Sequence, residues 1–501
     1  MDELIFENEN HLPDNSSENN FQLEINFEAD AEQNRFRKTL DNGDFVMLIE
    51  HNSVGLDNDF EVAKERLAQL EEVVLNIKSL NAALAITDSY ASTNCYKSID
   101  YAMGLSPENR DRHVIYLSGR NSSIEDMKAN LNLAQSANFK NIVAVSGDPV
   151  YGEGVRATQK RSFLESVHTL QLVRQNYANM LFDGCVMNPF QYTPYTLFPQ
   201  YSKLVKKLNA GAKFIVTQAG YDMLKLQALR WYLGERGLFF PTIARLFFLS
   251  PEIVEAILDN RIPGIKISND FKKILDKELQ FSRNQFESAQ WRRLELQAAG
   301  CRLLGYSGIQ IMGIDTPTKI KSAADRISGA LREFNNFEQW LEEYNGYLSK
   351  IDMAPVSGSF YMYDRVLRRS YPETPPRISE FKAPVLSKSE KLLYNLRKFM
   401  FHATTKQNAQ NRRFWKILLA NCRSCKNCRL PHTFYVCPEQ CPKKSANGPC
   451  GGVKANGNCE LGNFECIHSY MMRLAMWRKE INTLEDDYLP IEGIDLQGDI
   501  K

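Results

Sequence analysis

NIVAVSGD, at residues 141–148, shows the pattern that decides the fold of this chain. A short apolar run rich in β-branched residues ends in small and polar residues, which is typical of a strand buried on both faces of a parallel sheet. Seven further runs repeat the pattern: FVMLIE (45–50), AALAIT (82–87), HVIYLS (113–118), FDGCVMN (182–188), KFIVTQ (213–218), LFFPTIA (238–244) and GIQIMGID (308–315). Longer amphipathic segments, such as residues 59–80, separate them. Eight strand–helix units predict an α/β fold, a TIM-type (β/α)8 barrel, although an open doubly wound sheet would give the same alternation.

Polar residues stand where several predicted strands end. In a barrel, the carboxyl ends of all strands meet at one mouth, which is where such folds carry their chemistry. We therefore expect the polar strand-end residues to share one face of the molecule. They are Glu50, Thr87, Asp148, Asn188 and Gln218.

The rest of the chain divides into segments of different composition. Residues 1–38 are acidic, with no Lys or Arg before Arg35, and predict a disordered tail. The barrel is predicted over residues 39–350, and a proline-containing linker or strap over 351–386. A cysteine-rich metal-binding domain is predicted over 387–485, and a polar tail over 486–501.

The bulk composition excludes several classes of protein. The 61 basic residues balance 60 acidic ones, so no overall positive field predicts binding to nucleic acid or to a membrane surface. No apolar run approaches the roughly 18 residues that a membrane-spanning helix needs. The acidic N-terminus lacks the features of a secretory signal, so we expect a cytoplasmic protein.

Eight of the eleven cysteines lie close together near the C-terminus: Cys422, Cys425, Cys428, Cys437, Cys441, Cys450, Cys459 and Cys466. Their spacing begins C-x2-C-x2-C, and eight thiolates suffice for two four-thiolate metal sites. In a reducing compartment, metal binding is favoured over the alternative of a disulfide framework. Ferredoxin-like iron–sulfur clusters, structural zinc, or one of each would satisfy the eight cysteines.

Several stretches resemble the methylenetetrahydrofolate reductase family. They are VSGDP (145–149) followed by YGEG, NAGAKFIVTQAGYD (209–222) and NRIPGI (260–265), in that family's order and spacing. NGPCGG (447–452) resembles the cysteine-rich domain associated with some of its members. The resemblance implies a barrel that binds a flavin, FAD or FMN, and reduces 5,10-methylenetetrahydrofolate to 5-methyltetrahydrofolate in one-carbon and methionine metabolism. The reductant would be NAD(P)H or a redox partner protein, and a homo-oligomer is left open.

The resemblance also implies roles for single residues. Glu50 would be the acid that protonates the substrate nitrogen, and Asp148 would stabilise the iminium form of the substrate. Gln218 and Tyr221 would bind the folate. The flavin would be contacted by Thr87, Tyr116, Ser118, Ser146, Gly147, Asp148, Arg156 and Asn188.

Three stretches depart from the family pattern. HNSV (51–54) replaces an apolar and proline-rich segment, His113 is displaced on the third strand, and MGID (312–315) ends the eighth strand. These departures leave two alternatives open. One is a flavin barrel that acts on another one-carbon carrier, and the other is a non-catalytic subunit that docks into a redox complex through its cysteine domain.

Overall fold

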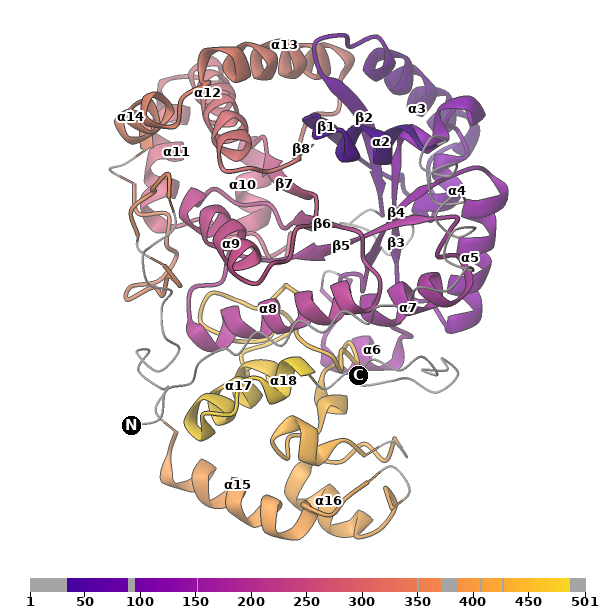
Figure 1. Ribbon diagram of the computed structural model, residues 1–501, viewed down its shortest axis with the longest axis vertical. Helices are drawn as coiled ribbons and strands as arrows, with labels where there is room; N and C mark the ends of the chain where they lie inside the picture. Colours follow the sequence, from indigo (N-terminus) through magenta and orange to yellow (C-terminus); the bar gives the residue numbers. More distant parts are fainter. Residues whose placement is uncertain are drawn as a thin grey trace, which may run out of the picture.

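The computed structural model describes residues 34–88, 95–150, 152–348, 351–363, 365–370, 386–405, 408–425 and 428–486. Within these ranges, eight parallel strands close into a barrel in sequence order, so the predicted TIM-type fold is confirmed over the open sheet (Figure 1). The strands are β1 (Val46–Asn52), β2 (Asn81–Thr87), β3 (Val114–Ser118), β4 (Asn141–Val145), β5 (Phe182–Met187), β6 (Phe214–Thr217), β7 (Thr242–Phe247) and β8 (Gly308–Met312).

Helices surround the barrel and connect its strands (Figure 1). They are α3 (Phe60–Leu75), α4 (Ser98–Ala102), the 3-10 helix η1 (Pro107–Arg112), α5 (Ile124–Ser136), α6 (Val155–Lys160), α7 (Ser166–Asn176), α8 (Pro194–Asn209), α9 (Met223–Glu235), α10 (Pro251–Leu258), α11 (Asn269–Phe281), α12 (Arg283–Leu303), α13 (Pro317–Glu333) and α14 (Phe337–Leu348). Most begin with a side-chain cap, as in α5, where Ser123 and Asp126 form a capping box.

The pleat of β1 divides its residues between the barrel interior and the helix layer. Val46 and Leu48 belong to the interior apolar cluster, whereas Met47 and Ile49 pack with the surrounding helices. Because side chains alternate along a strand, Glu50 follows Val46 and Leu48 into the interior. The strand therefore delivers a carboxylate to the mouth of the barrel.

A short helix, α2 (Arg35–Asp41), closes the opposite end of the barrel. The ring of Phe36 lies 6.2 Å from that of Phe182 and 5.5 Å from that of Phe214, at the first residues of β5 and β6. The predicted tail over residues 1–38 therefore needs correction, because residues 34–38 are folded where Phe36 buries its apolar surface. Residues 1–33 lie outside the described part of the chain.

The seventh strand also needs correction. It was expected at residues 238–244, but β7 begins at Thr242. Pro241 has no N–H to donate to a strand ladder, and the strand starts directly after it. Phe239 is 84% exposed, so the apolar letters before the proline do not mark a buried strand.

The cysteine-rich segment forms a separate small domain next to the barrel (Figure 1). Its elements are α15 (Lys388–Phe401), α16 (Arg413–Ala420), η3 (Leu430–Thr433), η4 (Pro438–Gln440), α17 (Ile467–Arg478) and α18 (Thr483–Asp486). Helices α17 and α18 pack on α8, and one apolar cluster continues from α8 into α17. Thirteen of the 16 residues of α8 are buried, because the helix lies between the barrel and this domain.

The segment after α14 runs along the barrel. The Phe360 amide donates to the carbonyl of Tyr192 (2.9 Å), and the Tyr361 hydroxyl donates to Asp222 (2.7 Å). This part of the predicted linker is a strap, and residues 371–385 lie outside the described ranges. None of the helices in the described ranges is both long and apolar enough to cross a membrane.

Candidate active site at the barrel mouth

The inward-facing layer at the carboxyl ends of the strands is polar. Tyr116 of β3 donates to Gln310 of β8 (2.7 Å), and Gln310 donates to Glu50 of β1 (2.7 Å). Arg245 of β7 holds the same carboxylate through two nitrogens, with Nε 2.6 Å from Glu50 Oε2. Planar guanidinium and carboxylate groups suit this bidentate geometry, so the pair fixes the position of Glu50.

Gln218, which follows β6, is oriented by the same arginine. Its Oε1 accepts from Arg245 Nη1 (3.1 Å) and from the amide of Ala219 (3.0 Å). The side-chain NH2 lies against Gly264 in the NRIPGI stretch, where a Cβ would come within 2.8 Å of Gln218 Nε2. Gly264 also has φ +85°, so glycine alone gives both the turn and the space.

A hollow opens above this layer, and its volume is about 990 Å3 when the solvent-filled space at its entrance is included. It is lined by nine of the eleven barrel residues that the sequence predicts for the site: Glu50, Thr87, Tyr116, Ser118, Ser146, Gly147, Asp148, Asn188 and Gln218. The predicted convergence of distant strand ends is therefore present. The roles of these residues in binding and catalysis stay predictions.

Two predicted residues do not reach the hollow. The Tyr221 hydroxyl donates to the carbonyl of Phe247 (3.3 Å), and its ring packs on Phe271 in a neighbouring apolar cluster. Arg156 is exposed on α6 and does not line the hollow. Neither placement supports the predicted ligand contact, because the side chain of Tyr221 is engaged elsewhere and Arg156 belongs to the outer surface.

Three carboxyl groups line the hollow, those of Glu50, Asp88 and Asp148, and the two predicted ones, Glu50 and Asp148, differ in their surroundings. The Glu50 side chain is 2% exposed and forms an ion pair with Arg245. The Asp148 side chain is 42% exposed and lines the hollow. Desolvation by the surrounding protein raises the pKa of Asp148, Lys443 opposes this shift, and the charge of Glu460 adds to it. Asp148 is therefore the carboxyl group of the hollow that combines access with a raised pKa.

The C-terminal domain supplies one wall of the hollow. Pro449, Cys450 and Gly451 of the NGPCGG stretch line it together with the strand ends. Asn188 Nδ2 donates to the carbonyl of Gly451 (2.7 Å) and to that of Gly264 (3.1 Å), so it ties the two domains together at the mouth. The sequence predicts the polar strand ends and the NGPCGG stretch separately, but it does not predict that they line the same hollow.

A buried ion pair extends this contact. Lys443 of the C-terminal domain lies 2.8 Å from Glu460 and 3.7 Å from Asp148. The thiol of Cys450 donates to Glu460 (3.0 Å). Lys443 and Glu460 thus link Asp148 of the barrel to Cys450 of the C-terminal domain.

A second buried pair lies between α7 and α8. Glu165 lies 2.7 Å from Lys203 and accepts from the amide of Asn447 (3.1 Å). Lys203 also donates to Ser445 (2.8 Å) and to the carbonyl of Gly448 (3.0 Å). These contacts hold the segment that carries the NGPCGG stretch against the barrel.

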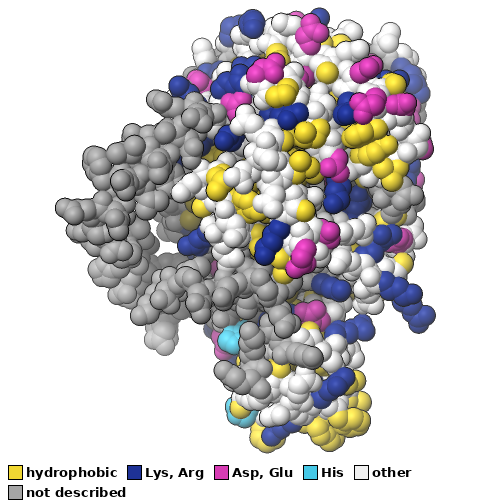
Figure 2. Space-filling view, turned by 90° about the vertical axis from the view of Figure 1, so that its right-hand side faces the viewer, with side chains coloured by type: hydrophobic (Ala, Val, Ile, Leu, Met, Phe, Trp, Pro, Cys, Tyr) yellow, Lys and Arg dark blue, Asp and Glu magenta, His cyan; other side chains and the backbone are white. Residues whose placement is uncertain are grey.

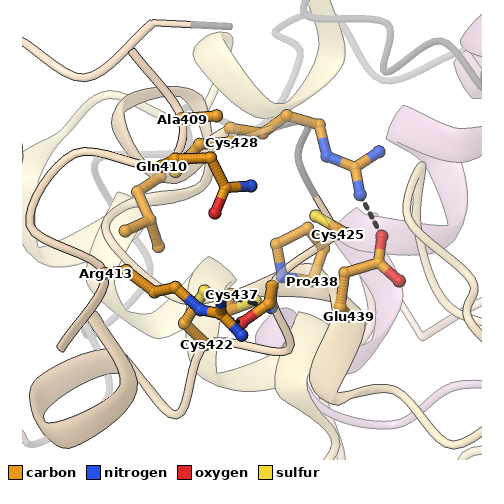
Figure 3. Close-up of a pocket in the computed structure, with 12 residues that line it drawn as sticks. Ala409, Gln410, Arg413, Cys422, Cys425, Cys428, Cys437, Pro438 and Glu439 are labelled. Atoms are coloured by element: carbon orange, nitrogen blue, oxygen red, sulfur yellow. Dashed lines mark hydrogen bonds and ion pairs between the residues drawn. The ribbon is translucent and has the colours of Figure 1, made fainter.

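The eight C-terminal cysteines separate into two sets of four. The outer set lines one small hollow and consists of Cys422, Cys425, Cys428 and Cys437 (Figure 3). The inner set consists of Cys441, Cys450, Cys459 and Cys466. Burial, together with negative charge on Cys441 and Cys459, raises the pKa of Cys466 to about 12. Cys450 and Cys459 are likewise affected by the charge of Cys441, so these thiols lie within electrostatic range of one another.

Metal binding by these sets stays a prediction. Across the described ranges, no three or more His, Cys, Asp or Glu side chains are already placed to hold a metal ion. The donor chemistry nevertheless fits, since four thiols around one hollow are the ligands that zinc and iron–sulfur clusters use. Burial raises the pKa of Cys437 to about 11, so an ion would have to displace protons from the thiols.

The barrel hollow also fits a planar heterocycle. Gln200 of α8 lines it, and its buried Nε2 has no hydrogen-bond partner among the residues that the structure describes. A buried unpaired donor costs about 1–3 kcal/mol, which a ligand with an acceptor edge would recover. Flavin and pterin rings both present carbonyl and ring-nitrogen acceptors.

Several residues of the site were not predicted from the sequence. Arg245 had one signal, because it is the charged residue within the apolar run TIARLFF. Lys443, Lys203 and Glu165 had none, since their pairing depends on how two domains meet. Cys450 was predicted as a metal ligand but not as a residue of the barrel mouth.

Two family models match the chain. The model described as methylenetetrahydrofolate reductase matches residues 61–278, and the model described as methylene-tetrahydrofolate reductase C terminal matches residues 401–492. No curated protein sequence matches the chain.

Two solved structures show weak similarity. An uncharacterized protein from Clostridium thermocellum that binds two copies of 5-methyl-5,6,7,8-tetrahydrofolic acid is 16% identical, with a TM-score of 0.43, and the match covers 58% of this chain and 97% of that chain. A Pseudomonas aeruginosa protein described as "a putative dihydrodipicolinate synthetase" is 13% identical, with a TM-score of 0.27, over 58% of this chain and 99% of that chain. Neither similarity carries an argument about function.

Proposed function

This chain belongs to the methylenetetrahydrofolate reductase family, and from that premise we propose that it uses a bound flavin to reduce 5,10-methylenetetrahydrofolate to 5-methyltetrahydrofolate. The observation that carries the proposal is the hollow at the barrel mouth, where Glu50, Asp148 and Gln218 come together with the strand-end residues. Residues at the carboxyl ends of seven strands, β1 to β7, converge there without filling the space.

The flavin would occupy the hollow against the polar strand ends. Ser118, Gly147 and Asn188 would contact it, and the unpaired Gln200 amide would donate to an acceptor on one of the two rings. When bound, the flavin supplies hydride transfer, which no amino-acid side chain can provide.

The protein's own groups would manage protons and orientation. The Oε1 of Gln218 is occupied by two internal donors, so its NH2 is the group that would bind the pterin's acceptors. Opening of the five-membered ring of the substrate requires a proton on the departing nitrogen. Asp148 Oδ can give that proton directly to a ligand in the hollow, whereas Glu50 can do so only after the ligand displaces Arg245.

The two cysteine sets support a link to electron transfer. The inner set reaches the barrel mouth through Cys450. The short helix η4 joins Cys437 of the outer set to Cys441 of the inner set. Four residues span at most about 14 Å, so the two sets are close neighbours. If these thiolates hold iron–sulfur clusters, they supply one-electron chemistry; if they hold zinc, they supply a scaffold.

The test separates flavin reduction from folate reduction in two variants, Glu50→Gln and Asp148→Asn. Anaerobic stopped-flow absorbance would follow the flavin as dithionite reduces it and as the folate substrate reoxidises it. Removing the proton donor should slow reoxidation by about 10²–10⁴-fold while flavin reduction stays near the wild-type rate. Asp315→Asn is the control, because Asp315 is an exposed carboxylate near the end of β8 that does not line the hollow.

Two results would reject the proposal in different ways. Purified protein that binds neither FAD nor FMN would reject the flavin barrel. Wild-type rates of folate reduction in both variants would reject Glu50 and Asp148 as the proton donor.

A further inference from the structure

The far end of the C-terminal domain exposes a cluster of large apolar side chains. We name it the tip face, and it consists of Leu392, Leu396 and Phe399 of α15 with Phe414, Trp415, Ile417 and Leu418 of α16. Phe399 is 78% exposed and Phe414 is 70% exposed. Figure 2 shows hydrophobic side chains gathered at the lower end of the molecule. Apolar patches of this kind mark surfaces that bind a partner.

The apolar side chains of α15 lie on one side of that helix. Leu392, Leu396 and Phe399 follow the spacing i, i+4, i+7, so they form a single stripe. The opposite side is used inside the domain, where Tyr394, Arg397 and Phe401 are buried. Arg397 Nε also donates to the carbonyl of Leu419 (2.7 Å), which joins α15 to α16. The stripe is therefore left over after the domain's own core has formed.

The same segment is strongly basic. Residues 388–429 contain eleven Lys and Arg against one acidic residue, Glu390, whereas the whole chain has 61 against 60. Several of these cations are exposed beside the tip face: Lys388, Lys398, Arg412, Arg413 and Arg423. An excess of positive charge in this otherwise balanced chain therefore surrounds the exposed apolar side chains of the tip face.

The tip face adjoins the outer cysteine set. Arg413, the first residue of α16, lines the hollow that contains Cys422, Cys425, Cys428 and Cys437 (Figure 3). Its Nε also donates to Ser424 (3.1 Å), between the first two cysteines of the set. A molecule seated on α16 would therefore lie against the edge of this hollow.

We propose that the tip face docks a small acidic electron-carrier protein, which would place the carrier's redox group beside the outer cysteine set. This proposal rests on the proposed function and names its electron donor. Exposed aromatic residues and arginines are the groups that dominate protein–protein interfaces, and the surrounding cations would steer an acidic partner. A membrane or a nucleic acid would match the charge, but neither would make use of the four thiols at the edge of the face.

The redox balance is simple. Reduction of 5,10-methylenetetrahydrofolate to 5-methyltetrahydrofolate takes two electrons and two protons. One carrier with two one-electron clusters, or two carriers with one cluster each, would therefore be oxidised in each turnover. One proton would reach the substrate nitrogen through the barrel's acid, and the other would be taken up from solvent with the two electrons of the transferred hydride.

The experiment measures binding of an acidic two-cluster ferredoxin to the full-length holoprotein by thermophoresis under anaerobic conditions. The double variant Phe399→Glu/Phe414→Glu should weaken binding by about tenfold or more, because it places charge in the apolar centre of the face and repels the acidic partner. Its matched control is Phe239→Glu/Phe281→Glu, which changes two phenylalanines of the barrel that are 84% and 73% exposed. Raising the salt from about 0.05 to 0.3 M should weaken wild-type binding.

Each other outcome overturns the proposal. Three of these outcomes are no binding of the ferredoxin, equal binding by both double variants, and binding to anionic vesicles or single-stranded DNA instead. The fourth is binding of the ferredoxin only after removal of the acidic residues 1–33, which would identify that segment as the occupant of the tip face. Dithionite-driven folate reduction is measured in parallel. Wild-type protein that fails this assay rejects the proposed function, whereas a normal rate without ferredoxin binding rejects only the docking surface.

Discussion

Arg245 determines the electrostatic state of the barrel mouth. Its guanidinium is the partner that permits a carboxylate at Glu50 to be buried, and it also fixes the amide of Gln218. A buried carboxylate without a partner is strongly unfavourable. The ion pair therefore contributes to stability as well as to the chemistry of the site.

Replacing Arg245 with Gln should destabilise the protein by about 3–5 kcal/mol, because the variant leaves Glu50 buried and unpaired. Adding Glu50→Gln should recover much of that loss, since two amides can hydrogen-bond without a net charge. Urea unfolding followed by circular dichroism measures both variants. If the double variant is as unstable as the sum of the two single variants, the two side chains are not coupled as the structure indicates.

At the scale of single residues, the sequence predicted the groups that stand at strand ends and missed those whose roles depend on a partner. Glu50 and Gln218 could be placed at the mouth because parallel strands end together. His113, which departs from the family pattern, is a buried core histidine whose ring accepts from the amide of Leu84 (3.0 Å) and bonds to Glu71 (2.9 Å). Arg245 was not identified because its strand was predicted to end before it.

At the scale of elements, α8 connects the two domains. Burial alone would raise the pKa of Glu165 at the start of α7, but Lys203, His168 and the Asn447 amide outweigh it and hold the pKa well below its ordinary value of 4.5. A carboxyl group with a lowered pKa in the folded state contributes stability above its unfolded pKa. That stability is lost as the pH falls below about 4.5.

The difference in melting temperature between wild type and Glu165→Gln should therefore shrink as the pH is lowered from about 6 to 3, because the variant lacks this titration. Lys203→Met should cost about 3–5 kcal/mol near neutral pH, since it leaves Glu165 buried without its cation. Scanning calorimetry across this pH range measures both effects, with Glu61→Gln as an exposed control. A pH-independent difference for Glu165→Gln would contradict the assigned ion pair.

The element boundaries show where sequence patterns stop being sufficient. The apolar run before Pro241 resembles a strand, but only the residues after the proline can join the ladder. Likewise, the first turn of α2 was assigned to a tail, because nothing in its local composition shows that Phe36 fills the end of a barrel. In both cases the tertiary packing, and not the local preference, sets the boundary.

At the scale of the whole molecule, the barrel and the C-terminal domain share a core and a site. The apolar cluster that includes Leu204 of α8 continues into Met472 of α17, and the Glu165–Lys203 pair is completed by residues 445–448. Two domains joined only by a linker unfold independently, whereas domains that share buried apolar and ionic contacts unfold together.

We therefore expect the full chain to unfold in a single cooperative transition, in which the calorimetric and van't Hoff enthalpies agree. The physical reason is that separation of the domains would expose one side of α8 and leave Glu165 without the four hydrogen-bond donors that Ser445, Ala446 and Asn447 supply. Lys203→Met tests the coupling directly, because weakening the shared ion pair should broaden or split the transition before it unfolds either part alone. Two resolved transitions in the wild-type protein would show that the C-terminal domain unfolds independently. Cys450 would then not be a fixed part of the lining of the barrel mouth.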